Sequence, residues 1–353
     1  MKVVFLVIDD KEYLEHAPGN WPEGPHRLEA IWTALTQTGV REALVFDSPR
    51  PATPEDLALV HTKAHIEGVR RISEQGGGYL TLDTVITPRS YEIALLAAGG
   101  TMKAVDAVID GEACRAAALV RPPGHHATAS EGMGFCLFNN VAVAAAHALS
   151  RRKLEKVLIV DWDLHHGNGT ESLFYASRRV LFFSCHESPA YPGTGWITDV
   201  GEGEGEGYTI NVPMPSGSGD LDYHDAFKRV LLPAATAYRP DMILVSCGLD
   251  AHHLDPLGHL ELSSAGYGVL TELLCSLADT VSGGRLVFVL EGGYDPIGLG
   301  WGMASVLNVA SGRGGPLDEP NPYTHPRSET HRSALARDRL SSVIATQEAY
   351  WPL

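Results

Sequence analysis

The feature that most constrains this fold is an apolar run ending abruptly in charged residues, from Val157 to Thr170 (VLIVDWDLHHGNGT). Its β-branched start is typical of a strand buried on both faces. Carboxylates and imidazoles at the end of such a strand are costly to desolvate, so they need partners or a metal ion. Asp163 and His165 are two apart, on one side of an extended backbone, where they can begin a zinc-type site. A salt-bridged or helix-capping pair is the alternative, which D-x-H alone does not exclude.

Further buried runs alternate with helical segments along the chain. Strands are predicted at residues 3–8, 43–46, 116–120, 157–161, 180–184, 208–212, 242–246 and 285–290, with longer helices at 27–38, 90–109, 139–149, 221–238, 263–281 and 299–310. This alternation predicts an α/β fold: a single three-layer α/β/α domain with a mostly parallel central sheet of roughly eight strands. We expect a catalytic domain over residues 1–312. A C-terminal extension over 313–353, with a polar segment from Ser311 to Arg327 and one helix, should pack on it.

The amino-acid composition limits which classes of binding partner and which cellular compartment we expect. Lys plus Arg number 27 against 43 Asp plus Glu, a net charge of −16, which disfavours direct nucleic-acid binding and favours cationic or neutral partners. Five scattered cysteines without a C-x-x-C pair indicate reduced thiols in a cytoplasmic protein. The apolar start, Met1 to Ile8, is too short to cross a bilayer, so we expect no membrane partner. A homo-oligomer is compatible with the sequence, which does not fix the assembly state.

Polar, chemically reactive residues follow several of the predicted strands. They are His125-His126, Asp161 to His166, Ser184 to His186, Asp250 and Tyr294. Because the carboxyl ends of parallel strands share one edge of a sheet, we expect these residues to meet at one site. Asp163, His165 and Asp250 would give a metal three ligands and leave room for water and a substrate oxygen. The histidine pair could supply acid–base groups, and Tyr294 could donate its hydroxyl to a developing oxyanion.

Six motifs in this order resemble the metal-dependent histone deacetylase family. They are RPPGHH, GFCLFNN, DWDLHHGNGT, PGTG, GLDAHHLDPLG and EGGY, spread from about Pro22 to Ala310. The family includes the acetylpolyamine amidohydrolases and has the arginase/deacetylase fold; HHGNGT and LDAH are similar to its class II and bacterial branches. The resemblance implies hydrolysis of an acetyl or longer acyl amide of a primary amine, such as acyl-lysine or an acetylpolyamine. It also implies Zn²⁺, or Fe²⁺ in the cell, on Asp163, His165 and Asp250.

The resemblance implies roles for further residues. His126 would be the general base that takes a proton from the attacking water and later protonates the leaving amine. His125, positioned by Asp161, would act mainly through its charge, and Tyr294 would hydrogen-bond the oxyanion. Arg27 matches an arginine beneath the active site, near an acetate-release channel.

A substrate tunnel and two K⁺ or Na⁺ sites are also implied. The tunnel residues would be Gly134, Phe135, Tyr191 and Leu257. One cation site would use the carbonyls of Asp161, Asp163 and His165 with Ser184 and Cys185. The second would involve Phe174, Ser177, Val180 and Tyr208.

Three departures from the family pattern bear on chemistry. Asn168 stands where some relatives have an aspartate behind the second histidine, so the pKa of His126 should be lower than beside a carboxylate. Tyr191 replaces the more usual tunnel phenylalanine. Leu257 stands where one branch of polyamine deacetylases has a glutamate, which argues against that route to polyamine specificity.

Two alternative functions remain open. A two-metal ureohydrolase on the same fold would need a second carboxylate-rich metal shell, which Asp250-Ala251-His252 does not supply. A non-catalytic acyl-lysine binding protein would not need the full ligand set and Tyr294. Asp83 is left between two interpretations, a ligand for a substrate backbone and a solvated loop carboxylate.

Overall fold

The structure, a computed structural model, describes residues 3–320 and 333–353. Eight strands form one sheet, in which every pairing is parallel, in the order β2-β1-β5-β10-β9-β6-β7-β8. Along the chain these strands are β1 (Val3–Ile8), β2 (Val45–Asp47), β5 (Ala113–Ala118), β6 (Val157–Asp161), β7 (Val180–Glu187), β8 (Thr209–Met214), β9 (Met242–Cys247) and β10 (Leu286–Leu290). The short strands β3 (Gly78–Thr81) and β4 (Thr84–Ile86) form a separate antiparallel hairpin.

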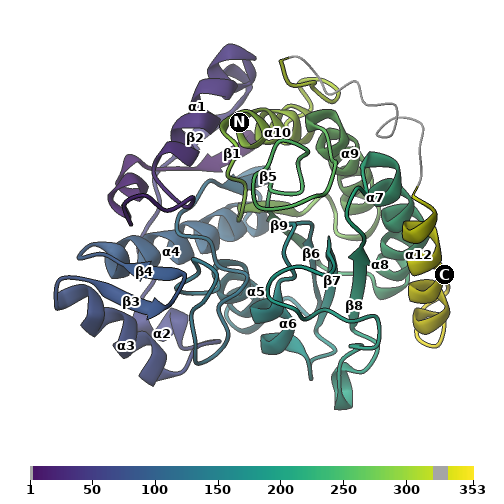
Figure 1. Ribbon diagram of the computed structural model, residues 1–353, viewed down its shortest axis with the longest axis horizontal. Coiled ribbons are helices and arrows are strands. Elements are labelled where there is room, and N and C mark those ends of the chain that lie inside the picture. The colour runs from purple at the N-terminus through teal and green to yellow at the C-terminus, as the bar shows by residue number, and fades with distance from the viewer. Residues whose placement is uncertain (1–2, 321–332) are drawn as a thin grey trace.

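Helices cover both faces of the sheet (Figure 1). One layer contains α1 (His26–Gln37), α7 (Asp220–Ala226), α8 (Leu232–Tyr238), α9 (Ser264–Val281) and α10 (Pro296–Ala310), and the other contains α4 (Ser90–Ile109) and α5 (Asn140–Ser150). Smaller helices are α2 (Pro54–Leu57), α3 (Lys63–Glu74) and α6 (Asn168–Phe174), with helical turns at Lys11–Glu15, Val40–Ala43 and Gly203–Gly205. The C-terminal helix α12 (Ala334–Gln347) packs on edge strand β8.

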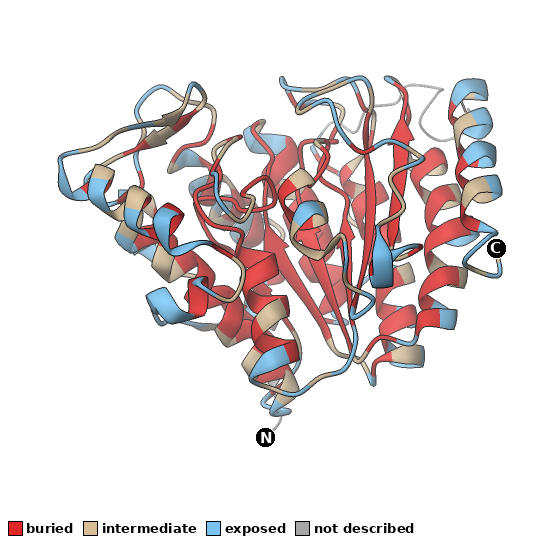
Figure 2. Ribbon diagram, turned by 90° about the horizontal axis from the view of Figure 1, so that it is seen from below, coloured by how far each residue is buried: buried red, intermediate tan, exposed pale blue. Residues whose placement is uncertain are grey.

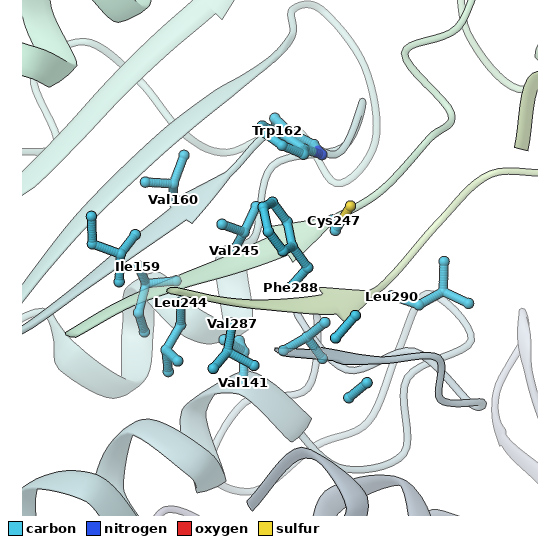
Figure 3. Close-up of a cluster of buried hydrophobic side chains, with 14 of the residues drawn as sticks. Val141, Ile159, Val160, Trp162, Leu244, Val245, Cys247, Val287, Phe288 and Leu290 are labelled. Atoms are coloured by element: carbon cyan, nitrogen blue, oxygen red, sulfur yellow. The ribbon is translucent and has the colours of Figure 1, made fainter. Parts of the chain in front are cut away.

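The core lies on both sides of the central strands. Figure 2 shows these strands as buried along their length, and Figure 3 shows apolar side chains of β6, β9 and β10 packed together. Ile159, Leu244 and Val287 have no exposed surface. Burying such a side chain stabilises the fold by about 1.5–3 kcal/mol. Double-sided burial explains why these strands are uninterrupted apolar runs in the sequence, and the predicted three-layer α/β fold with a parallel eight-stranded sheet is confirmed.

Two local features differ from the elements predicted above. No strand was predicted between residues 46 and 116, but Gly78 to Ile86 folds into the β3–β4 hairpin. The predicted helix at 221–238 is interrupted by a π-helical turn, Phe227–Leu231. Pro233 explains the interruption: it has no N–H for the α-helical bond to the Arg229 carbonyl, and the N–H of Leu232 bonds instead to the Phe227 carbonyl, five residues back.

The C-terminal prediction is only partly within the described residues. Of the polar segment expected at 311–327, the residues from 321 onward lie outside them. The expected C-terminal helix is α12, while the proposed boundary at residue 312 stays a prediction. In the described part of the chain, no helix is both long enough and apolar enough to cross a membrane.

Candidate active site

The three predicted metal ligands meet at the carboxyl edge of the sheet. Asp163 and His165 lie just after β6, and Asp250 lies just after the neighbouring strand β9. Nδ1 of His165 is 3.2 Å from Oδ1 of Asp163 and 3.1 Å from Oδ2 of Asp250. The remaining carboxylate oxygens accept backbone hydrogen bonds, from Gly292 to Asp163 at 2.8 Å and from Leu164 to Asp250 at 2.7 Å. One oxygen of each aspartate and one imidazole nitrogen are therefore turned toward a common point.

The charge and shape of this pocket suit a divalent cation. Asp163 and Asp250 are almost fully buried. Burial lowers the pKa of His165, but the two carboxylates outweigh it and raise the pKa to about 10. The pocket thus attracts positive charge strongly, and a divalent ion would neutralise both carboxylates where a proton neutralises one. A Cβ on Gly292 would lie 2.2 Å from Oδ2 of Asp250, so glycine is needed beside the ligands. Two carboxylate oxygens and one imidazole match the donor set of a catalytic zinc site.

The paired histidines lie beside the ligands in different surroundings. Nδ1 of His125 donates to Oδ2 of Asp161 at 3.0 Å, whereas Nδ1 of His126 donates to the amide oxygen of Asn168 at 2.7 Å. Burial lowers the pKa of His125, but the charges of Asp163 and Asp161 outweigh it and raise the pKa well above the usual value. Burial and the neighbouring imidazoles lower the pKa of His126 well below its usual value. A neutral His126 with its proton on Nδ1 leaves Nε2 free to accept another.

Tyr294 is held at the same site through its backbone. Its N–H donates to Oδ2 of Asp255 at 2.7 Å, and the carbonyl of Gly293 accepts from Nε of Arg27 at 2.7 Å. The Arg27 guanidinium lies over the tyrosine ring, 5.1 Å from its centroid. Burial raises the pKa of Tyr294 well above its usual value, so its hydroxyl keeps the proton that a hydrogen-bond donor needs.

A pocket of about 210 Å³ leads to these groups. It is lined by the four predicted tunnel residues, by three of the chemical groups and by one rim carboxylate: Gly134, Phe135, Tyr191, Leu257, His126, His165, Tyr294 and Asp83. Phe135 has a φ of 68°, an unusual conformation for a phenylalanine, and its N–H bonds to Oγ1 of Thr84 at 3.2 Å. The β3–β4 hairpin therefore braces one wall of the pocket.

Asp83 belongs to that brace. Its Oδ1 accepts from Thr81 at 2.7 Å, from Thr84 at 2.8 Å and from the N–H of Gly134 at 3.2 Å. The Tyr191 hydroxyl lies near the same carboxylate, from the opposite wall of the pocket. Asp83 is thus partly buried, with Oδ1 held by three hydrogen bonds, and its role toward a substrate backbone stays a prediction.

The residues predicted for the two monovalent-cation sites lie at the two ends of β7, one set beside the proposed metal ligands and the other at the opposite edge of the sheet. Ser184 pairs with Asp161 across β6 and β7, and the carbonyl of the next residue, Cys185, accepts from Tyr223 at 3.2 Å. The second set lies around the start of β7: Phe174, Ser177, Val180 and Tyr208. Both cation sites stay predictions. His186 does not line the pocket, because its ring is buried against Ser184 and the Gly195 carbonyl.

Two buried carboxylates near the site were not anticipated. Glu291 accepts from the N–H groups of Gly124 and His125 at 2.6 and 3.1 Å, which ties the histidine loop to the end of β10. Glu23 binds Arg27 and Arg121 beneath the tyrosine turn. The sequence signal for Glu291 was a charge directly after a buried strand, the same signal that identified Asp161. Glu23 lies in a proline- and glycine-rich loop and had no such signal.

Comparisons with known proteins agree on one family. The model described as the histone deacetylase domain matches residues 21–310, close to the range expected from the motifs. A histone deacetylase-like amidohydrolase of Pseudomonas aeruginosa is 40% identical over 292 residues, covering 82% of this chain and 76% of its own. A probable deacetylase of Archaeoglobus fulgidus is 40% identical over 295 residues, covering 82% and 80%. The crystal structure of the HDA15 HD domain superposes with a TM-score of 0.89 at 37% identity, covering 99% of this chain and 95% of that one.

Proposed function

Because the chain belongs to the histone deacetylase family, and is therefore a deacetylase or amidohydrolase, we propose that it hydrolyses an acetyl or longer acyl amide of a primary amine with Zn²⁺ held by Asp163, His165 and Asp250. The observation that carries this proposal is the position of His165 Nδ1, within 3.2 Å of one carboxylate and 3.1 Å of the other. Family membership argues against the ureohydrolase and against the non-catalytic binding protein. The ligand types also suit Fe²⁺, so the native metal is a separate measurement.

The protein groups would act in sequence on the bound amide. When present, the zinc supplies a Lewis acid that polarises the amide carbonyl and lowers the pKa of water. His126 takes a proton from the attacking water on Nε2, because its Nδ1 proton is engaged by Asn168. It then gives that proton to the leaving amine. Tyr294 donates its hydroxyl to the oxygen that becomes negative in the transition state. His125, held by Asp161, remains a fixed positive charge beside the reaction.

A slender, cationic acyl-amine fits what surrounds the site. The pocket of about 210 Å³ is flanked by the rings of Phe135 and Tyr191, which suits an alkyl chain. The net charge of −16 favours a cationic carrier, such as a lysine-containing peptide or a polyamine. K⁺ or Na⁺ would occupy the two predicted monovalent sites as structural ions. The absence of a C-x-x-C pair among the five cysteines supports a cytoplasmic location.

The test is hydrolysis by the purified chain of an acetyl-lysine amide reporter and of acetylputrescine. We expect activity that a chelator removes and Zn²⁺ restores, with about one metal ion per chain by elemental analysis. Tyr294→Phe should lower kcat by about 10²–10³, the usual effect of losing an oxyanion donor, and Asp163→Ala should abolish activity. Tyr79→Phe is the matched control, because Tyr79 is 66% exposed. Activity that survives unchanged in both site variants would overturn the proposal.

A further inference from the structure

The segment between β9 and α9 contains a loop, Asp250–Asp255, that carries one group needed for the reaction at each end. Asp250, a proposed metal ligand, begins it. Asp255 ends it and accepts from the backbone N–H groups of Tyr294 at 2.7 Å and Asp295 at 3.3 Å. Both carboxylates are buried. Any group that fixes this loop therefore also fixes the metal ligand relative to the catalytic tyrosine.

The middle of the loop is held by Glu319, a buried residue of the C-terminal part of the chain. Its Oε1 accepts from Nε2 of His253 at 2.9 Å, and its Oε2 accepts from the N–H of Ser264, the first residue of α9, at 3.0 Å. The same Oε2 lies 3.7 Å from Nε2 of His252, which is also 3.1 Å from the Ser264 hydroxyl. Glu319 is 2% exposed and His252 is 1% exposed. One carboxylate thus joins the loop, the start of a helix and the C-terminal segment.

These side chains also have the composition of a second metal site. The two imidazoles and the carboxylate have ligand atoms within 4.8 Å of one another. The hydrogen bonding favours a clamp instead. Leu254 donates its N–H to Nδ1 of His252 at 3.2 Å, so the proton of the neutral ring is on Nε2, the atom that a metal would have to bind. With that proton in place, Nε2 donates to the hydroxyl of Ser264 at 3.1 Å, and the Glu319 carboxylate lies 3.7 Å away.

We infer that Glu319 is a positioning residue, which clamps the Asp250–Asp255 loop and so keeps the metal ligand and Tyr294 in their relative geometry. Without its carboxylate, His253 and the Ser264 N–H each lose an acceptor, and the bond between His252 and the Ser264 hydroxyl is left as the side-chain link from the loop to the start of α9. Glu319 lies beyond residues 21–310, the part that the family model matches. The C-terminal part of this chain would thus complete an active site whose other groups lie within the family domain. The inference rests on the proposed function, which gives Asp250 and Tyr294 their roles.

The experiment compares Glu319→Ala and Glu319→Gln with wild type in the full chain. The matched control is Asp318→Asn, a change in the adjacent, exposed carboxylate. The readouts are the rate of zinc loss to a colorimetric chelator, amide hydrogen exchange of residues 250–255 and 292–295, and kcat and KM. We expect Glu319→Ala to lose zinc about 10-fold faster, as for groups that support metal ligands, with faster exchange in both segments and a lower kcat at similar KM. Glu319→Gln should be intermediate, because its amide oxygen keeps one acceptor, and Asp318→Asn should match wild type.

Two results would overturn the inference. One is zinc loss and exchange in the Glu319 variants that equal those of wild type. The other is two metal ions per wild-type chain and one per Glu319→Ala chain, which would make this group a metal site. Should the alanine variant fail to fold, the glutamine variant decides. Zinc loss and exchange require no substrate, so they test Glu319 even if neither acetyl substrate is hydrolysed.

Discussion

The buried carboxylate of Glu23 is the most sharply testable element beneath the site, because two buried arginines depend on it. Its oxygens lie 2.6 Å from Nε and 2.8 Å from Nη2 of Arg121, and 3.3 Å from Nη1 of Arg27. All three side chains are at most 1% exposed. Burial raises the pKa of Glu23, but Arg121 and His16 outweigh it and hold the pKa well below its usual range. The carboxylate is therefore ionised, and its removal would leave the arginines without this compensating charge.

The expected cost follows from that geometry. Removing one side of a buried ion pair typically costs about 3–5 kcal/mol. An unfolding entropy of roughly 2.1 cal/mol/K per residue gives about 0.74 kcal/mol/K for 353 residues, so Glu23→Ala should lower Tm by about 4–7 °C. Glu15→Ala is the matched control. Glu15 pairs with Arg89 at 2.9 Å, but these side chains are 50% and 44% exposed, so its loss should cost less than about 1 kcal/mol.

The measurement is thermal unfolding of the three proteins at one scan rate, followed by kcat far below Tm. Because Nε of Arg27 donates to the carbonyl of Gly293, which precedes the proposed oxyanion donor Tyr294, Glu23→Ala should also lower kcat. A Tm within about 1 °C of wild type would refute the reasoning, since the buried arginines would then be compensated by other groups. Equal destabilisation by Glu15→Ala would refute it as well, because burial would then make no difference to the cost.

Three further changes test the pocket itself. Asn168→Asp should move the acid limb of the pH profile of kcat/KM to higher pH. A carboxylate 2.7 Å from Nδ1 raises the pKa of His126, and the protonated ring can no longer act as a base. An acid limb at the same pH as in wild type would contradict this. Gly134→Ala would place a Cβ 2.4 Å from Cδ2 of His126 at a φ of +56°, so steady-state kinetics should give a kcat at least about 10-fold lower. Tyr191→Phe removes a hydroxyl that lies beside Asp83 in the pocket wall, so we expect KM to rise by about 2- to 10-fold, the worth of one hydrogen bond, with kcat unchanged.

The sequence predicted the fold and the metal-ligand cluster because both depend on local patterns. Buried parallel strands are continuous apolar runs in the sequence. A charged side chain directly after such a run costs free energy to bury unless it is paired or binds a metal ion. Asp163, His165 and Asp250 were identified in this way, and the structure brings them together. Their roles as ligands await the metal analysis.

Glu23 and Glu319 could not be predicted in the same way, because they do not follow a buried strand and their partners are distant in the sequence. Glu23 binds an arginine 98 residues away, and Glu319 binds an amide 55 residues away. In the sequence, a carboxylate in a loop is most simply a solvated one. Only the packed chain shows which of them are buried. The strands of the β3–β4 hairpin were not predicted because they are short, half-buried and lack a long apolar run.

The two adjacent histidines differ in pKa because different groups accept the Nδ1 proton of each ring. Their centroids are 4.0 Å apart, so two positive charges there would repel each other strongly. Behind His125 lies the carboxylate of Asp161, which draws a proton to that ring. Behind His126 lies the neutral amide of Asn168, which fixes the Nδ1 tautomer without adding negative charge. The positive charge therefore settles on His125, and the repulsion it exerts keeps His126 neutral, as its proposed role of general base requires. A second carboxylate, behind His126, would draw a proton to that ring too; the neutral amide of Asn168 avoids this.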